Sequence, residues 1–168
     1  LDDVLFINKT EYDQIDLQVE PIDLIGFCSK LVDEIKSKTT DKHQLLFSHE
    51  GDCKEFTSDP KMLRQMLTNL ISNAIKYSPQ GGKVELNAKF DNNQVILEVT
   101  DEGIGIPKHD QRELFNSFSR GSNIGSIAGI GLGLSIVKSY VEHHQGEIVM
   151  ESEIGLGTRV KVSLPLLA

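Results

Sequence analysis

The sequence predicts an α+β domain: a two-layer α/β sandwich in which a mixed sheet of about five main strands carries three long helices on one face. Two observations support this class. Segments with alternating apolar residues lie beside segments whose apolar residues recur at spacings of three and four, so both strands and helices occur. Some alternating segments also follow one another across short turns, which indicates antiparallel hairpins within the sheet.

The first third of the chain contains signals for two strands and two helical segments. Residues 1–9 have a helical spacing too short for an independent helix, so they are interpreted as the end of a longer one. A strand is expected at 15–19, where apolar residues alternate. Pro21 is expected to open a helix that runs to about Lys38, and a further strand follows at 44–50.

The rest of the chain begins with a clear helix start. Asp59 can cap the helix and Pro60 suits its first turn, so a helix is predicted from there to about Tyr77. The remaining expected elements are strands at 83–90 and 94–101, a short helix at 109–118, a helix at 134–144 that Gly146 ends, and a closing hairpin of 147–152 with 158–166.

Composition limits the class of protein. The chain has 168 residues, of which 39% are hydrophobic and 25% charged, as expected of one globular domain. Its net charge of −8 argues against nucleic acid or an anionic membrane as the main partner. No apolar run reaches the roughly 20 residues that a membrane span needs. Cys28 and Cys53 lack metal-site spacing, so reduced thiols in a cytoplasmic protein are expected.

Asp101 stands out in the predicted strand 94–101. Side chains alternate along a strand, so Asp101 shares one face with the core residues Leu97 and Val99. A carboxylate there is costly unless it is hydrogen-bonded. It is therefore either a turn residue that reaches solvent or an acceptor for a ligand donor such as an exocyclic amine. Gly103 and Gly105 would then let a flat ligand approach the backbone.

The helix 60–77 carries an unusual polar stripe opposite its apolar one. Solvated helix faces usually hold Glu and Lys, whereas asparagine is a mediocre helix former. One asparagine alone would be interpreted as a structural amide. Several amides aligned with a lysine favour a site for Mg²⁺ and phosphate, because amide oxygens ligate the metal and lysine meets phosphate charge. The residues of the stripe are Gln65, Asn69, Ser72, Asn73 and Lys76.

A glycine-rich stretch, "GIGLGLS", precedes the last predicted helix. The N-terminus of a helix offers free N–H groups and a positive dipole end, which suits phosphate. A dinucleotide-binding motif would need an apolar strand before the glycines, and a polar loop stands there instead. The phosphate loop of the G-x-x-x-x-G-K-[ST] type is also absent. Any nucleotide is therefore expected to bind in another way.

Taken in order, five motifs resemble the catalytic and ATP-binding domain of sensor histidine kinases. These are "QMLTNLISNAIKYSP", "DEGIGIP", "LFNSFSRG", "GIGLGLSIV" and "GLGTRV", and the similarity runs from about Gln14 to Leu166. The wider superfamily, with the Bergerat fold, includes gyrase-type ATPases, heat-shock chaperones and anti-sigma-factor serine kinases. The resemblance implies ATP and Mg²⁺ as the bound groups.

The resemblance also implies roles for individual residues. Asp101 would accept from the adenine amine, Thr158 would support the adenine pocket, and Asn73 would hold Mg²⁺. Phe115 and Phe118 would anchor a mobile lid at 119–128. The residues implied in catalysis are Asn69, Asn73, Lys76 and Arg120. Those implied in nucleotide binding are Asn73, Lys76, Tyr77, Asp101, Gly103, Gly105, Ile106, Phe118, Arg120, Gly129, Gly131, Leu132, Gly133, Leu134 and Thr158.

Asn69 favours phosphoryl transfer over hydrolysis. In the gyrase and chaperone branches a glutamate at this position orients the attacking water, and an amide cannot serve as a base. A serine kinase of the anti-sigma type or a slow ATPase remains the alternative function, and a non-catalytic nucleotide-sensing module is a third class. Those serine kinases usually keep an acid at this position.

The chain is expected to lack the histidine that such kinases phosphorylate. His49 is followed by Glu50 but not by the arginine and proline of the family's acceptor motif, and His144 lies on an apolar helix side. His43, His109 and His143 are expected at the surface. Residues 1–13 would then be the end of an upstream dimerisation helix and linker, and 14–168 the catalytic domain. The resemblance implies as partners that dimerisation domain, through which the full-length protein would form a homodimer, and a response regulator receiver domain. The net charge argues against nucleic acid, and the isolated fragment is expected to be monomeric.

Overall fold

The computed structural model describes residues 16–52, 55–115 and 133–166. Five strands form one mixed sheet in the order β2-β4-β5-β7-β6. β2 pairs with β4 in parallel, and the other neighbours are antiparallel. The strands are β2 (His43–Glu50), β4 (Gly82–Asp91), β5 (Gln94–Asp101), β6 (Glu147–Glu153) and β7 (Gly157–Pro165).

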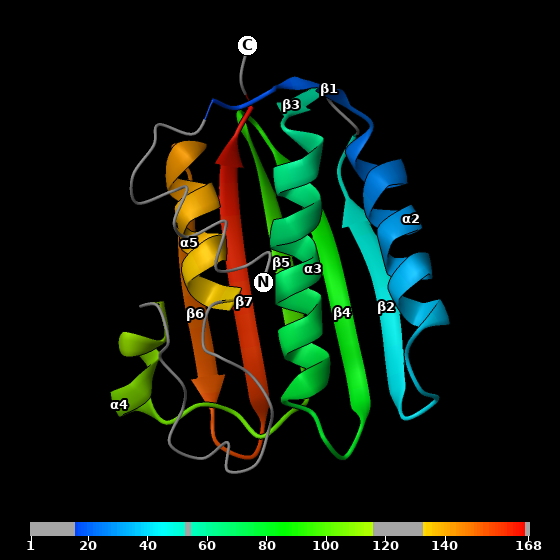
Figure 1. Cartoon of the computed structure of the whole chain (residues 1–168), viewed down its shortest axis with the longest axis vertical. Helices are drawn as coiled ribbons and strands as arrows, with labels where there is room; N and C mark the ends of the chain where they lie inside the picture. Colours follow the sequence, from blue (N-terminus) through cyan, green and yellow to red (C-terminus); the bar gives the residue numbers. More distant parts are fainter. Residues whose placement is uncertain (1–15, 53–54, 116–132, 167–168) are drawn as a thin grey trace.

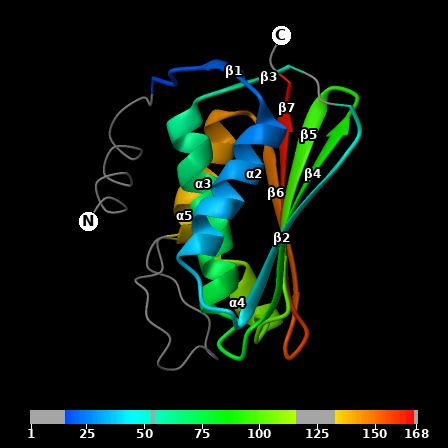
Figure 2. The same cartoon turned by 90° about the vertical axis from the view of Figure 1, so that its right-hand side faces the viewer.

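Three helices cover one face of this sheet, and Figure 2 shows the two layers edge-on. They are α2 (Leu24–Ser37), α3 (Pro60–Lys76) and α5 (Gly133–His143). α3 lies between the other two (Figure 1). The core fills the space between the layers, because every second residue of β5 is buried against the apolar sides of the helices. The predicted two-layer α+β class is thus confirmed. Among the described helices, none is long and apolar enough to cross a membrane.

The start of the described chain differs from the prediction. Residues 16–19 form no strand, and the strand β1 (Glu20–Ile22) follows them and contains Pro21. β1 pairs with β3 (Phe56–Ser58), a short strand that the sequence did not predict. Pro21 therefore does not open a helix. α2 begins at Leu24, because the side chain of Asp23 accepts a hydrogen bond from the backbone N–H of Gly26.

The other helix ends follow local chemistry. Asp59 caps α3 through hydrogen bonds from the backbone N–H groups of Lys61 and Met62, as predicted. α5 ends one residue earlier than expected from Gly146, because Gln145 takes the left-handed conformation at φ 58°. The N–H of Gly146 then bonds the carbonyl of Val141. Gly146 is still needed there, since a Cβ would lie 2.3 Å from the carbonyl oxygen of Ser163.

The predicted helix at 109–118 is only a short turn of helix in the described residues. It consists of α4 (Lys108–Gln111) and the 3-10 helix η1 (Glu113–Phe115). Residues 116–118 of that prediction lie outside the described chain, as do the predicted helical end at 1–9 and Cys53. Cys28 is a buried free thiol, and burial raises its pKa to about 12.

Candidate functional site

Asp101 is the last residue of β5 and ends its buried side. Only 8% of its surface is exposed. Its Oδ1 accepts hydrogen bonds from the backbone N–H of Gly103 at 2.8 Å and of Thr158 at 3.3 Å. Its Oδ2 makes no hydrogen bond with any described residue. Burial raises the pKa of Asp101 from 3.8 to about 6, although the two backbone N–H groups oppose this. One oxygen is therefore fixed, and the described residues leave the other available as an acceptor.

A row of polar residues crosses the sheet at this point. The register pairs Asp101 of β5 with Thr158 of β7, and Thr158 with Ser152 of β6. Paired residues on neighbouring strands point to the same face, so all three share the face that the helices cover. The hydroxyls of Ser152 and Thr158 lie 2.7 Å apart. The predicted adenine residues Asp101 and Thr158 are thus side by side.

The loop after β5 passes between the end of α3 and the β6–β7 turn. The N–H of Ile104 bonds the carbonyl of Tyr77, the C-cap residue of α3. A Cβ on Gly103 would lie 2.2 Å from that carbonyl oxygen, and one on Gly105, at φ 73°, would lie 2.1 Å from the carbonyl of Glu153. The chain's own backbone therefore requires both glycines, a reason that the sequence did not reveal.

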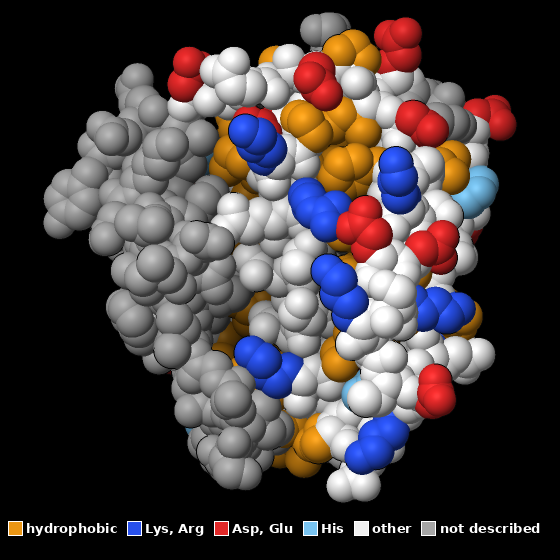
Figure 3. All heavy atoms as spheres, turned by 45° about the vertical axis from the view of Figure 1, so that its right-hand side comes forward, with side chains coloured by type: hydrophobic (Ala, Val, Ile, Leu, Met, Phe, Trp, Pro, Cys, Tyr) orange, Lys and Arg blue, Asp and Glu red, His pale blue; other side chains and the backbone are white. Residues whose placement is uncertain are grey.

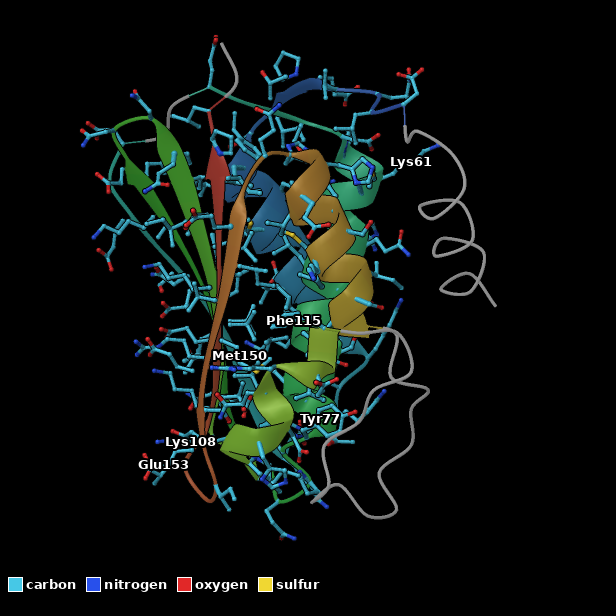
Figure 4. All side chains as sticks on the ribbon, turned by 90° about the vertical axis from the view of Figure 1, so that its left-hand side faces the viewer. Lys61, Tyr77, Lys108, Phe115, Met150 and Glu153 are labelled. Atoms are coloured by element: carbon cyan, nitrogen blue, oxygen red, sulfur yellow. The ribbon has the colours of Figure 1, made fainter. Side chains whose placement is uncertain are left out.

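Ile106 and Gln111 fasten the same loop to β6. The N–H of Ile106 donates to Ser152 Oγ at 2.8 Å, and Gln111 Nε2 donates to the carbonyls of Ile106 and Ser152. Ser152 was not among the predicted site residues. The alternation of apolar residues in 147–152 was the available signal, since it puts Ser152 on the inward side with Ile148 and Met150. Figure 4 shows Tyr77, Lys108 and Glu153 at this end of the sandwich.

The two predicted asparagines lie on the last turns of α3. Asn73 is one turn before Tyr77, and Asn69 is two turns before it; both are half-buried. Nδ2 of Asn69 is buried and has no hydrogen-bond partner among the described residues. The end of α3 and the start of α5 both face the end of the molecule at which β5 ends (Figure 1). The backbone thus brings Asn73 and Asp101 to the same end of the fold.

The predicted polar stripe of α3 does not stay together. Ser72 and Lys76 line a groove of about 370 Å³ between α2 and α3, and Asn69 and Asn73 are not among its lining residues. An ion pair between Arg64 and Glu34 also lines this groove. Figure 3 shows basic side chains over this part of the surface. The divergence arises because residues three apart on a helix differ by about 60° in direction.

Several predicted site residues lie outside the described part of the chain. They are the lid at 119–128 with Phe118, Arg120, Gly129, Gly131 and Leu132. Gly133 is the first residue of α5, which therefore begins one residue before the predicted start at Leu134. Leu134 packs against the core, and Phe115, at the end of η1, is half-buried.

The burial of two histidines differs from the prediction. His43 is not a surface residue: it is half-buried, and its Nε2 lies 2.8 Å from the carbonyl of Ser78, so this nitrogen carries the proton. His143 is also half-buried, with Nδ1 2.7 Å from the carbonyl of Ser139. His109 is exposed, and so is His49 in β2. His144 is buried, as expected.

A five-stranded mixed sheet under three helices, with a buried acid where β5 meets the end of α3, defines a Bergerat-type ATPase fold. The model of the family described as histidine kinase-, DNA gyrase B-, and HSP90-like ATPase matches residues 58–168. The chain belongs to this family. The predicted family is thus confirmed.

The curated relatives that the chain resembles include named histidine kinases. The chain is 34% identical to the circadian input-output histidine kinase CikA of Synechococcus elongatus, over 98% of this chain and 22% of that protein. It is also 34% identical to the sensor histidine kinase WalK of Bacillus subtilis, over 98% of this chain and 28% of that protein. The chain therefore spans about a quarter of the length of these relatives.

Two solved structures have the same fold. Full-length ShkA in complex with AMPPNP superposes with a TM-score of 0.88 at 25% identity, covering 99% of this chain and 35% of that one. The mycobacterial sensor histidine kinase MprB superposes with a TM-score of 0.75 at 27% identity, covering 87% of this chain and 97% of that one.

Proposed function

We propose that this chain is the catalytic domain that binds ATP in a sensor histidine kinase and donates the γ-phosphoryl group to a histidine on a separate dimerisation domain. A response regulator receiver domain would take the phosphoryl group onward. One observation carries the proposal: a buried carboxylate, with one oxygen that no described residue uses, stands at the end of β5 in a chain whose relatives are named as histidine kinases.

The adenine end of the site would be formed by the row across the sheet. Asp101 Oδ2 is the acceptor for the exocyclic amine, because Oδ1 is occupied by two backbone N–H groups. Thr158 and Ile106, which both hydrogen-bond Ser152, would border this position, and Tyr77, whose carbonyl accepts from Ile104, would close it from α3. Burial of Asp101 has a cost that a ligand donor would offset, which suits a carboxylate kept for binding.

The phosphate end would be formed by α3 and α5. Asn73 fits Mg²⁺ in ligand type, because its half-buried side-chain amide has an oxygen that can bind the ion. The buried Nδ2 of neighbouring Asn69 has no described partner, and this N–H group would donate to a phosphate oxygen rather than bind the metal. No described group of three or more acidic, histidine or cysteine side chains forms a metal site, so phosphate oxygens would supply most ligands. Asn73 would hold the ion, which neutralises phosphate charge during transfer. The N-terminus of α5 would meet the phosphates with its backbone N–H groups.

Asn69 favours transfer of the phosphoryl group to a protein over hydrolysis of ATP. An amide cannot take a proton from water, so the residue would orient but not activate a nucleophile. Lys76 and Arg120 are proposed to meet the phosphate charge. For Lys76 this requires its exposed side chain to turn from the α2–α3 groove toward Asn73. The bound ATP would thus wait for an acceptor histidine from the partner domain.

Calorimetry with Mg-AMPPNP tests the binding site. The wild-type chain is expected to bind, and Asn73→Ala to lose binding of the magnesium form, since both motif and helix position put the amide at the metal. Ser72→Ala, on the groove side of the same turn, is the matched control and should bind like the wild type. Wild-type affinity of Asn73→Ala would remove Asn73 from the proposed metal site.

Phosphoryl transfer is tested by adding a helical hairpin that carries the acceptor histidine. Labelled phosphate should appear on the hairpin and be lost in acid but kept in base, as phosphohistidine is. The chain alone should remain unlabelled. Acid-stable label on a serine protein, or steady ATP hydrolysis without a hairpin, would instead support the serine kinase or the slow ATPase.

A further inference from the structure

Ser152 makes three hydrogen bonds through one hydroxyl group. Its Oγ lies 2.8 Å from the N–H of Ile106, 3.0 Å from the carbonyl of Gly157 and 2.7 Å from Thr158 Oγ1. The first partner can only donate and the second can only accept. A hydroxyl has a single proton and two lone pairs. That proton must therefore point at the carbonyl of Gly157.

This assignment fixes the direction of the third hydrogen bond. Ser152 has no proton left for Thr158, so the hydroxyl of Thr158 must donate to Ser152 Oγ. Thr158 then has no proton for anything else, and only lone pairs of its Oγ1 remain. Without Ser152 the Thr158 hydroxyl could rotate and either donate or accept. Ser152 thus controls the hydrogen-bonding character of its neighbour.

Asp101, the next residue in the same row, has the same character. Its carboxylate only accepts when ionised, and its Oδ2 is free of described partners. The side chains of Asp101 and Thr158 stand side by side on one sheet face. Together they present acceptors without a donor to a ligand placed between the sheet and the end of α3.

The geometry points to Ser152 as a residue that determines base specificity, by holding the Thr158 hydroxyl so that the base pocket accepts 6-amino purines and rejects 6-oxo purines. The inference deepens the proposed ATP site and depends on it. A 6-amino group donates to such a pocket. At the same position a 6-oxo group is itself an acceptor, so two acceptors would face one another, and a site with such unpaired groups discriminates strongly against the ligand. The N1–H of a 6-oxo purine is a donor, so the discrimination concerns the atom at position 6. Ser152 is a positioning residue, since it acts through Thr158.

The experiment compares the affinities of the whole chain for Mg-ATP and Mg-ITP by calorimetry at pH 8. The wild type should prefer ATP. In Ser152→Ala the Thr158 hydroxyl can turn and donate to the 6-oxo group, so the preference should fall by about tenfold, mainly through tighter ITP binding. Ser152→Thr keeps a hydroxyl and should restore the wild-type ratio. Ser163→Ala, on the opposite face of the sheet, is the matched control. An unchanged ratio in folded Ser152→Ala would overturn the inference.

Thr158→Val gives an independent test should Ser152→Ala fail to fold. If Thr158 only accepts, its loss removes a repulsive contact with ITP and the preference for ATP narrows. If Thr158 donates to the base, the same change removes a contact that ITP could use, and the preference widens, which would contradict the inference. In the Thr158→Val background, Ser152→Ala should no longer alter the ratio.

Failure of the proposed function has a different signature. A wild-type chain that binds neither nucleotide would refute the ATP site itself. A wild-type chain that binds ATP, with a ratio insensitive to Ser152 and Thr158, would refute only the role of Ser152. A lower melting temperature in Ser152→Ala with an unchanged ratio would make the residue purely structural.

Discussion

A polar cluster lies beside each end of α3, one fully buried and the other buried or half-buried, and the clusters differ in what they leave unpaired. We call Ser58, Tyr140 and His144 the closed cluster and Asp101, Thr158 and Ser152 the open cluster. The helix between them has 17 residues and is about 25 Å long. The closed cluster lies where α3 begins, beside Asp59, and the open cluster lies where α3 ends.

The closed cluster satisfies its hydroxyls internally. Ser58 Oγ lies 2.6 Å from the hydroxyl of Tyr140 and 3.1 Å from Nε2 of His144, and all three residues are at most 1% exposed. Burial lowers the pKa of His144, so the ring is neutral at physiological pH. The cluster joins β3 to α5 and contains no ionised group of its own.

The open cluster contains an ionised carboxylate, whose Oδ2 no described residue uses. Neutral polar groups that partner one another are typical of structural packing. A buried carboxylate whose second oxygen has no partner among the described residues is costly to keep ionised, and such costs concentrate at functional sites. The closed cluster also contains a buried atom without a described partner, Nδ1 of His144, but this atom belongs to a neutral ring. The charge of the unpaired group, rather than burial or an unpaired atom alone, therefore separates the binding end from the structural end.

Substitution of Asp101 in the open cluster should change ATP binding more than any other substitution described below. Asp101→Asn should keep the two hydrogen bonds to Oδ1 but turn a donor toward the base amine, so Mg-ATP affinity should fall by more than about 100-fold. Calorimetry measures this. Glu98→Gln, on the outer face of the same strand, is the control and should bind normally. Retained ATP affinity in Asp101→Asn would show that the two clusters do not differ in function.

The same substitution should stabilise the empty protein in a pH-dependent way. The pKa of Asp101 is raised from 3.8 to about 6, so its contribution to stability is full below pH 3.8 and is lost as pH rises through 6. Asp101→Asn has no charge to bury. Its advantage over the wild type in free energy of unfolding should therefore be larger at pH 8 than at pH 5, by on the order of 1 kcal/mol. Urea unfolding at both pH values measures the difference.

If the free energies of unfolding of Asp101→Asn and the wild type differed by the same amount at pH 5 and pH 8, the raised pKa of Asp101 would be contradicted. If the stability advantage of Asp101→Asn became smaller as pH rises, the pKa of Asp101 would be lowered rather than raised. The two N–H groups that bond Oδ1 would then outweigh the effect of burial on this pKa.

The closed cluster should respond in stability alone. Ser58→Ala leaves the Tyr140 hydroxyl and His144 Nε2 buried without their shared partner, which should lower the free energy of unfolding by about 2 kcal/mol. Mg-ATP affinity at a temperature where the variant is folded should stay within about twofold. Ser163→Ala should change neither quantity. Loss of ATP affinity in folded Ser58→Ala would mean that the closed end is coupled to the site.

The sequence predicted well those features that local chemistry determines. Asp59 and Pro60 mark the start of α3, and the alternation in β5 puts Asp101 on the buried side. The sequence did not predict features that depend on pairing between residues far apart in the chain. The strands β1 and β3 have three residues each and exist because they pair with one another, so no local pattern marks them. Pro21 lies in that pairing rather than at a helix start.

In the candidate site, too, local motifs predicted some residues, and contacts between distant segments determined the others. The motifs gave Asp101 and Thr158, whereas Ser152 depends on the register of β6 with β7, which single residues do not encode. Asn73 and Lys76 lie three apart and were assigned to one stripe, but Lys76 lines the groove toward α2. A motif identifies residue types at a site. The hydrogen-bond partners of each oxygen require the folded chain.

The smallest expected effect concerns His43, which supports the open end from behind. Its Nε2–H donates to the carbonyl of Ser78, which also accepts from the N–H of Gly81 at 2.9 Å. Ser78 follows Tyr77, whose carbonyl holds Ile104. His43→Leu removes one of two donors to that carbonyl, so the free energy of unfolding should fall by only about 1 kcal/mol.

ATP affinity of His43→Leu should fall by no more than about threefold, because the Gly81 and Ile104 hydrogen bonds still hold the turn. His43→Gln can still donate from a side-chain amide and should recover most of both losses, as measured by urea unfolding and calorimetry. A roughly tenfold loss of ATP affinity in His43→Leu, with His43→Gln no better, would mean that the ring itself shapes the pocket. The binding site would then include His43 of β2 in addition to the open cluster, and the comparison of two clusters would no longer account for the whole site.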